Sequence, residues 1–567
     1  MTGEATAGHR ALGAVIVAAL SIAVVTPHVF PLTSLSTLSY DWIDADLFLW
    51  NFWWTKHAVI AAQQPWWTDL LLYPTGASLA FHTNPLPYSL VTVPVQAAIE
   101  GARGLVVSFN GIVMISSVAS GLGAYFLALR VTKSVPASVV AGLVFVCAPY
   151  RMLNISRLHV LATEVLAWYV WAWVGFTDKQ TQARAILVGV GLALALYTSP
   201  EYAMHAAGFS VLWIVWAARA GGQLTSSFWR RTALAAVVCI ALASPLLMLQ
   251  ARSVARSEAT LVRSLNGVVA MWSPALVSFV TPSRVHPVYG EFFSAAGEFG
   301  TPNVTGMRSE TCVALTIWAL LFVAAGRMRR EGSQFWFIAA GVFLILTLGP
   351  YLRLTGTLTT GVPLPYAALY LVVPPLQFAR DPTRFFPIAL LMLSVISAFG
   401  VRTMLSRTRG GITSTLATAA LGALVIFEGL TVWPAKVSAA DLISPAYDVV
   451  SRATGEFAVL DLSPDQIALL AQTRHGRPIT AGRESNPRSV GASPRLAIER
   501  DLLDAAGTLA LDPETLATRL ATHRQELERL RLRFVIFPTG NSARVELAQR
   551  LGLRIATFGD RVVCELF

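Results

Sequence analysis

Long apolar runs, each close to the length of a membrane-spanning helix, occupy most of the first three quarters of the chain. They lie at about 11–31, 108–129, 135–150, 160–177, 185–200, 203–218, 232–250, 311–326, 334–352, 385–401 and 412–432. A helix needs about 20 mostly apolar residues to cross a bilayer. The pattern therefore predicts a polytopic α-helical membrane domain over residues 1–432 with about eleven spans. The first run has no small-residue cleavage signal, so we expect it to remain as a helix.

Positive charge gathers in every second connection between these runs. The cationic set contains Arg10; Arg130 and Lys133; Lys179 and Arg184; Arg219, Arg230 and Arg231; Arg327, Arg329 and Arg330; and Arg402, Arg407 and Arg409. Lysine and arginine mark the cytoplasmic side of a membrane protein. The N-terminus is thus predicted to be cytoplasmic, and the segments 32–107, 251–310 and 353–384 and everything after 433 to be external.

The first external loop, 32–107, is rich in aromatic residues. Leu47, Trp50, Trp53 and Trp54 recur at helical spacing, and Trp66, Trp67 and Tyr73 form a second aromatic group. Amphipathic tryptophan-bearing helices lie at membrane interfaces. We expect interfacial helices here that hold the loop flat on the bilayer.

Beyond residue 433 the chain changes character. The short runs AVLDLS, RFVIFPT, LRIATF and RVVCELF have strand character. Between them, Asp512 and Pro513 stand where an N-cap and a first helical residue would open a polar helix. Residues 433–567 are therefore predicted to form a small, separable external α/β domain that contributes no catalytic group.

Composition supports a membrane protein and argues against two other classes. The chain is 54% hydrophobic and 13% charged, which is typical of a polytopic membrane protein. The formal charge of +11 is spread over topology-setting clusters, so nucleic acid is not expected as a partner. The four cysteines are far apart and lack metal-ligand spacing, so neither zinc nor a disulfide framework is predicted.

Three carboxylates, Asp41, Asp44 and Asp46, open the aromatic segment of the first external loop. In an extended segment Asp44 and Asp46 would share a side, whereas in a helix Asp41 and Asp44 would share a face. Such acids can act as a general base on a hydroxyl, hold a divalent cation or orient sugar hydroxyls. The alternative is that they only complement a helix dipole in a solvated loop.

A second cluster, QFARDPTRFF, spans residues 377–386. Asp381 is placed as an N-cap and Pro382 as the first helical residue of the tenth span. Arg380 and Arg384 flank this helix N-terminus, where the dipole disfavours cations unless an anion is present. A lipid phosphate would supply that anion. Alternatively, both arginines extend to lipid headgroups.

A third cluster, YTSPEYAMHAA, places Glu201 in the first turn of the sixth span and His205 one turn further in. Ionisable residues at that depth indicate a functional site, although Glu201 would also complement the helix dipole. Weaker candidates, each more simply explained as structural, are Arg151, Arg157, His159 and Glu164 near the third external connection, and His82 and Asn84 in FHTNP.

Taken in order, several motifs resemble uncharacterised bacterial members of the GT-C glycosyltransferase superfamily. They are DADLFLWNFWW, DLLLYPTGASLAFHTNPL, APYRMLN, TSPEYAM, GPYLRL, PLPYAALY, ARDPTRFF and, in the C-terminal part, QTRHGRPITAG. The resemblance implies a GT-C-like membrane enzyme that transfers a sugar from a polyprenyl-phosphate carrier to an acceptor outside the cytoplasmic membrane. It also implies an acidic catalytic base early in the first external loop, for which Asp44 matches best and Asp46 second.

The residues fit this chemistry independently. A lipid-phosphate sugar needs a base for the acceptor hydroxyl and positive charge for the departing phosphate. Asp44 would supply the first, and Arg380 and Arg384 the second, in one inverting displacement. No cofactor is required, and a divalent cation is compatible with the mechanism. The expected partners are a polyprenyl-phosphate sugar, membrane lipids and an envelope glycan, glycolipid or protein acceptor.

Two other classes of function share these features. A transporter or flippase for lipid-linked saccharides could also carry many helices and outward arginines, but it should show repeats and matched interrupted helices. The sequence shows no such symmetry. A noncatalytic protein that docks envelope polymers through its external domain is the second alternative.

Overall fold

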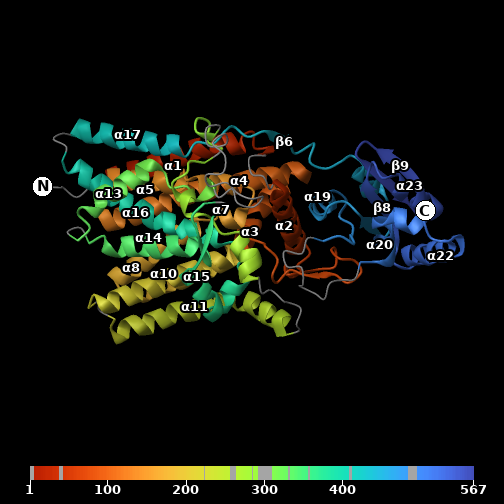
Figure 1. The fold of residues 1–567 in the computed structure, drawn as a ribbon, viewed down its shortest axis with the longest axis horizontal. Helices are drawn as coiled ribbons and strands as arrows, with labels where there is room; N and C mark the ends of the chain where they lie inside the picture. Colours follow the sequence, from red (N-terminus) through yellow and green to blue (C-terminus); the bar gives the residue numbers. More distant parts are fainter. Residues whose placement is uncertain are drawn as a thin grey trace.

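The structure is a computed structural model that describes residues 6–36, 42–221, 224–255, 264–283, 285–290, 309–329, 332–355, 358–407, 411–482 and 495–566. The molecule is elongated. A bundle of long helices fills one end and a small α/β unit the other, so that the first and last described residues lie at opposite ends (Figure 1). The helix α2 (Trp42–Ile60) lies between these two parts.

Every predicted apolar run contains a helix. These helices are α1 Ala7–Val29, α4 Gly101–Thr132, α5 Val135–Val146, α8 Glu164–Asp178, α9 Gln182–Thr198, α10 Pro200–Arg219, α11 Ser226–Ala255, α13 Leu315–Ala325, α14 Gln334–Thr347, α16 Phe386–Leu405 and α17 Gly411–Glu428. Within the described residues, 7 segments are long and apolar enough to cross a membrane. Helices α9, α13 and α14 are apolar but shorter. A helical membrane protein is confirmed, while the number of about eleven spans stays a prediction.

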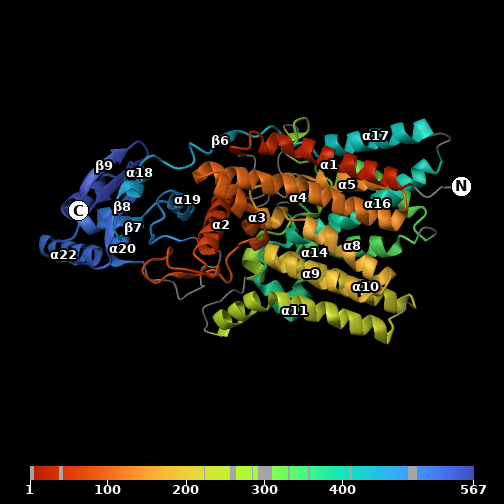
Figure 2. The same ribbon diagram turned by 180° about the vertical axis from the view of Figure 1, so that it is seen from behind.

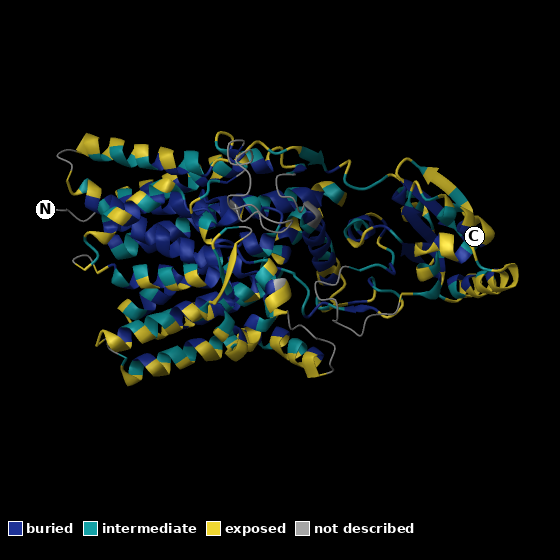
Figure 3. Cartoon of the chain, viewed as in Figure 1, coloured by how far each residue is buried: buried dark blue, intermediate teal, exposed yellow. Residues whose placement is uncertain are grey.

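The core of the bundle lies around α5 and α16, whose side chains are buried along nearly their whole length. Buried residues fill the middle of the bundle, and exposed ones lie toward its outer helices (Figure 3). Close helix contacts depend on small residues: a Cβ at Gly400 on α16 would lie 2.3 Å from the backbone oxygen of Leu320 on α13. Small residues let membrane helices approach closely. On the outside, α11 and α17 run along the bundle with exposed apolar side chains (Figure 2).

The C-terminal part contains the four strands that the sequence predicted. The strands are β7 Ala458–Asp461, β8 Leu532–Pro538, β9 Arg554–Phe558 and β10 Arg561–Glu565, in the order β7-β8-β10-β9. Only the β7–β8 pair of this sheet is parallel. The accompanying helices are α18 Tyr447–Arg452, α19 Asp465–His475, α20 Ala497–Leu503, α21 Ala505–Leu509, α22 Pro513–Arg529 and α23 Ser542–Arg550. As predicted, Asp512 caps α22, accepting from the Thr515 backbone N–H at 3.0 Å.

The remaining elements are short. Three two-stranded sheets pair β1 Ser34–Ser36 with β6 Lys436–Ser438, β2 Trp67–Thr68 with β3 Ala77–Ser78, and β4 Tyr351–Arg353 with β5 Thr359–Pro363. The short helical segments are α3 Leu86–Ala98, α6 Pro149–Leu153, α7 Leu158–Leu161, α15 Pro365–Val372, the π-helix η1 Leu265–Val269, and the 3-10 helices η2 Leu276–Phe279, η3 Ser309–Thr311, η4 Pro374–Phe378 and η5 Pro382–Phe385.

Trp50 and Trp54 of α2 pack inside the protein, contrary to the expectation that they lie at the membrane interface. Trp50 and Trp54 are fully buried, in one cluster with Leu469 and Phe534 of the α/β unit. The Trp50 indole N–H donates to the side-chain oxygen of Gln472 on α19 at 2.7 Å. The spacing of the apolar residues correctly predicts a helix, but these residues pack against protein and not against lipid.

Backbone hydrogen bonds join the first loop to the α/β unit as well. The Ile479 N–H donates to the Leu70 oxygen at 2.9 Å, and the Tyr73 N–H to the Ile479 oxygen at 3.0 Å. The loop thus extends toward the α/β unit instead of lying flat on a bilayer. Residues of the loop thus contribute to the core of the unit, and the separable domain over residues 433–567 stays a prediction.

Candidate functional site

Asp44 of the first loop forms an ion pair with Arg157, which lies more than a hundred residues further along the chain. The Asp44 Oδ2 atom lies 2.9 Å from the Nε atom of Arg157, and both side chains are largely buried. Asp44 sits in the first turn of α2, and Arg157 in the short connection between α6 and α7. Arg157 also donates to the Asn154 side-chain oxygen at 3.2 Å, so its guanidinium is held on two sides.

The helical start of α2 separates the acids that the sequence had grouped. Residues two apart on an α-helix point about 200° away from each other, so Asp44 and Asp46 lie on different faces. Asp46 is buried, with 1% of its surface exposed. Of the two arrangements that the sequence left open, the structure has the helical one, in which Asp44 and Asp46 do not pair. Asp41 lies outside the described residues.

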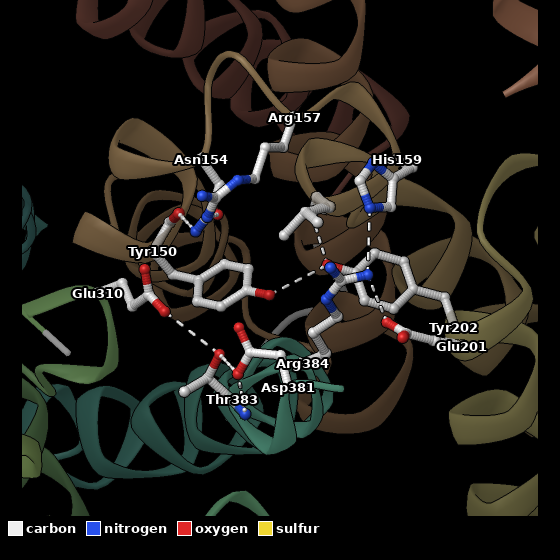
Figure 4. Close-up of polar contacts among 11 residues, drawn as sticks. Tyr150, Asn154, Arg157, His159, Glu201, Tyr202, Glu310, Asp381, Thr383 and Arg384 are labelled. Carbon is white, nitrogen blue, oxygen red and sulfur yellow. Dashed lines mark hydrogen bonds and ion pairs between the residues drawn. The ribbon is translucent and has the colours of Figure 1, made fainter. Parts of the chain in front are cut away.

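A second ion pair lies beside the first and joins two other predicted candidates. The Nη1 atom of Arg384 lies 2.7 Å from Glu201 Oε2 and 3.1 Å from His159 Nε2. Because a guanidinium can only donate, the histidine nitrogen accepts. The ring of His159 also contacts Phe48 of α2, with ring centroids 5.7 Å apart. The labelled side chains converge from the stretches 150–159, 201–202, 310 and 381–384 (Figure 4).

Asp381 caps the helix as the sequence predicted. Its carboxylate accepts from the Thr383 backbone N–H at 3.0 Å, and α16 is preceded by the single 3-10 turn η5. The Thr383 hydroxyl lies 2.7 Å from Asp381 and 3.2 Å from Glu310. The carboxylates of Asp381, Glu310 and Glu201 therefore supply part of the negative charge near the arginines. Glu201 already balances the charge of Arg384, so no phosphate is needed for that purpose.

Arg380 differs from its neighbours. Its guanidinium lies over the ring of Trp272, 4.4 Å from the ring centroid, and its side chain is exposed. Among the described residues Arg380 makes no salt bridge or hydrogen bond through its side chain. An aromatic ring orients a guanidinium without neutralising its charge. Arg380 is thus the cation of this cluster that an external anion can reach most directly.

The charges of the cluster act on one another over short range. The pKa of Arg157 is lowered to about 10, first by burial, while Glu310 raises it, Arg384 lowers it and Asp381 raises it. The guanidinium therefore stays charged at neutral pH. A cation that is buried among acids and other cations holds Asp44 in one orientation and keeps a positive field beside it.

Four other predicted candidates take part in different contacts. His82 bonds to the Asn51 side chain at 2.7 Å, and Asn84 accepts from the Ser89 hydroxyl at 2.8 Å, both along the first loop. His205 is buried, with its ring centroid 4.0 Å from that of Phe385, one turn below Glu201. Arg151 is fully buried among hydroxyl groups.

The sequence did not single out Glu310 and Thr383, and it gave no role to Arg157. Glu310 lies in a stretch without clear periodicity, Thr383 looked like an ordinary helix residue, and Arg157 was only one of several weak candidates. The sequence signal that could have found these three residues is that each lies just before the start of an apolar run. Position alone could not identify the partner, because the Asp44 and Arg157 side chains meet across 113 residues.

The acidic residues of the cluster offer few ligands for a metal ion. Over the described ranges, no group of three or more histidine, cysteine, aspartate or glutamate side chains is placed to hold a metal ion. The nearest approach to a ligand set is the Asp381–Thr383–Glu310 group, where a hydroxyl lies between two carboxylates. Two carboxylates and a hydroxyl are few ligands for Mg²⁺ or Ca²⁺ without water or substrate oxygens.

Comparisons with known proteins place the fold. No family model and no curated protein sequence matches the chain. Among solved structures, the oligosaccharyltransferase of Archaeoglobus fulgidus in its apo form is similar, with a TM-score of 0.51 and 11% identity over 93% of this chain and 69% of that one. The arabinofuranosyltransferase AftD from Mycobacteria is similar with a TM-score of 0.55 and 13% identity over 96% of this chain. The chain spans 39% of the AftD chain.

Both structures have the GT-C fold, and so does this chain. The resemblance seen in the sequence motifs is therefore confirmed at the level of fold.

Proposed function

We propose that the protein is a membrane glycosyltransferase that moves a sugar from a polyprenyl-phosphate donor to a hydroxyl of a cell-envelope acceptor. The GT-C fold supports the class of enzyme. The observation that carries the proposal is the grouping of Asp44 with Arg157, Arg380 and Arg384 at the end of the bundle that faces α2. An acid and several cations side by side match the needs of this reaction.

In this proposal Asp44 is the general base. The acceptor oxygen attacks the anomeric carbon, and its proton passes to the Asp44 carboxylate. The bond between that carbon and the phosphate oxygen breaks, and polyprenyl phosphate leaves with the electron pair. One displacement of this kind inverts the anomeric configuration. The bond from Arg157 fixes the direction of the carboxylate before the reaction.

Arg380 is proposed as the first ligand of the donor phosphate, because it is exposed and held over Trp272. Arg384 contributes charge from behind, and it can turn toward the phosphate when the donor competes with Glu201 for its N–H groups. Neutralising the departing phosphate stabilises the transition state. A divalent cation at Asp381 and Glu310 would add to this charge, and no step depends on it.

We propose that the site faces the outside of the cytoplasmic membrane, with a cytoplasmic N-terminus. The alternation of positive charge along the sequence supports this orientation. Reporter fusions at residues 331 and 440 should report opposite compartments, the first cytoplasmic and the second external. Two cytoplasmic reports would refute the placement.

The decisive experiment is incubation of the purified protein in lipid nanodiscs with a panel of polyprenyl-phosphate sugars and candidate envelope acceptors. We expect one donor to release polyprenyl phosphate, and Asp44→Asn to abolish most of that release. If no donor is consumed but one is bound, the protein is better described as a docking protein. Movement of an intact donor across proteoliposomes would instead indicate a transporter or flippase.

A further inference from the structure

Arg151 is a fully buried arginine that the sequence suggested as a substrate ligand, and its surroundings indicate another role. Its Nη1 atom donates to the Ser120 hydroxyl and to the Leu161 backbone oxygen, both at 2.7 Å, and also contacts the Thr163 hydroxyl. Its Nη2 atom donates to Ser117 at 3.2 Å. These partners come from α4 and from the end of α7.

A buried acid shares the same hydroxyl groups. Glu164 accepts from Ser116 at 2.7 Å and from Ser120 at 3.3 Å, and Arg151 bonds to both serines. Glu164 also contacts the Tyr88 hydroxyl of α3. The Arg151 guanidinium and the Glu164 carboxyl group are thus connected through the Ser116 and Ser120 hydroxyls. Buried polar groups are tolerated when they are hydrogen-bonded in this way.

This network holds the hairpin that carries two members of the candidate site. The hairpin runs from α6 to α7, residues 149–161, and includes Arg157 and His159. At its far end the Leu161 oxygen accepts from Arg151, and the Val160 oxygen accepts from the Tyr202 hydroxyl. Both ends of the hairpin are therefore fixed, because Arg151 itself belongs to α6.

We propose that Arg151 is a positioning residue: it fixes the α6–α7 hairpin so that Arg157 reaches Asp44 and His159 reaches Arg384. It does not touch the substrate. A few tenths of an ångström decide whether the 2.9 Å contact between Arg157 and Asp44 forms, and catalytic groups need that accuracy. The inference rests on the proposed transferase function for its kinetic part only.

The test must avoid a trivial loss of folding. Arg151→Met alone takes a hydrogen-bond partner from each buried group that the guanidinium bonds, which destabilises the network. The double variant Arg151→Met/Glu164→Gln removes both ionisable groups and keeps most of the volume. Tyr202→Phe is a milder variant, because it deletes only the two contacts of one hydroxyl, with the Val160 oxygen and with the Tyr150 hydroxyl. Arg402→Met is the matched control, since Arg402 also donates to a backbone oxygen, that of Thr132, but on the C-terminal half of α16.

Two measurements decide the matter. First, hydrogen exchange of residues 154–161 should accelerate at least about tenfold in Arg151→Met/Glu164→Gln and less in Tyr202→Phe, with α16 unchanged. Second, turnover should fall about 10- to 100-fold in the double variant when Arg157 is present. In an Arg157→Met background the same change should cost less than about threefold, since residues that act through each other are not additive.

Unchanged exchange at 154–161 in the double variant would overturn the proposal, and so would an equal loss of turnover with and without Arg157. A wild-type protein that consumes no donor would refute the proposed function, while the exchange measurement would still decide whether Arg151 positions the hairpin.

Discussion

The Asp44 carboxylate and the Arg157 guanidinium form a 2.9 Å ion pair between residues 113 positions apart in the chain. The pair joins the first helix after the N-terminal span to the hairpin between α6 and α7. It aims an acid at the region where three other charged side chains, Arg384, Glu201 and Asp381, also gather (Figure 4).

Asp44→Asn should reduce turnover by about 10²- to 10⁴-fold, the usual contribution of general acid–base catalysis. Size and hydrogen-bonding capacity are kept, so donor affinity should stay nearly unchanged. Polyprenyl phosphate release and donor binding are measured separately on the same preparation. Asp69→Asn, which alters an exposed acid of the same loop, should leave both quantities at the wild-type level. Wild-type turnover in Asp44→Asn would assign the base elsewhere, with Glu201 the next candidate.

Arg380→Ala should weaken donor binding by about 10- to 100-fold, in line with the loss of one charge-assisted hydrogen bond. Arg384→Ala should lower turnover more than affinity, because it also leaves Glu201 without its partner and His159 without its donor. Titration with polyprenyl phosphate, the product, gives the affinities. Arg230→Ala, a change of an exposed arginine on α11, serves as the control. If Arg380→Ala bound product as tightly as the wild type, the phosphate site would have to be placed elsewhere.

Local sequence signals predicted the parts of this structure that depend on neighbours in the chain. Hydropathy located the apolar helices, and the Asp381–Pro382 pair located the start of the tenth one. Predictions of contacts between residues far apart in the chain were wrong. The spacing of Trp50 and Trp54 was recognised, but Gln472 supplies the environment that lipid was expected to supply. Similarly, the charge of Arg384 invited a phosphate, because nothing in the sequence showed that Glu201 would reach it.

Gly400→Ala should destabilise the bundle by about 1 to 3 kcal/mol, the usual cost of overpacking. The added carbon would lie 2.3 Å from the Leu320 backbone oxygen, so α13 and α16 must move apart. Thermal unfolding in detergent measures the effect. Gly341→Ala on α14 is the control, because a Cβ there meets nothing within 4 Å. Equal melting temperatures for the two variants would show that the α13–α16 contact is looser than described.

His475 should make the α/β unit sensitive to acid. Burial lowers its pKa to about 3, with Arg477 as the second cause. Between that value and the ordinary value of about 6.5 the unfolded chain binds a proton that the folded one excludes. Stability contributed by this group is therefore complete above pH 6.5 and falls as the pH falls, by about 2 kcal/mol at pH 5.

The corresponding experiment compares unfolding at pH 7.5 and pH 5 for the wild type and His475→Phe, which can keep the stacking on Tyr447. The difference between the two pH values should shrink in the variant. Turnover of the folded variant at pH 7.5 should be near that of the wild type, since His475 lies in the α/β unit and not among the charged residues at Asp44. A complete loss of turnover in folded His475→Phe would mean that the α/β unit contributes to the chemistry.

The bond between Trp50 and Gln472 also orders events during synthesis. These residues are 422 positions apart, so α2 cannot complete its packing until α19 has been made. Until then the Trp50 indole N–H lacks its acceptor, the Gln472 side chain. A chain that stops before α19 would thus contain every charged residue of the candidate site and still lack the surface that holds α2 in place. The packing of α2 therefore depends on synthesis that continues at least through Gln472.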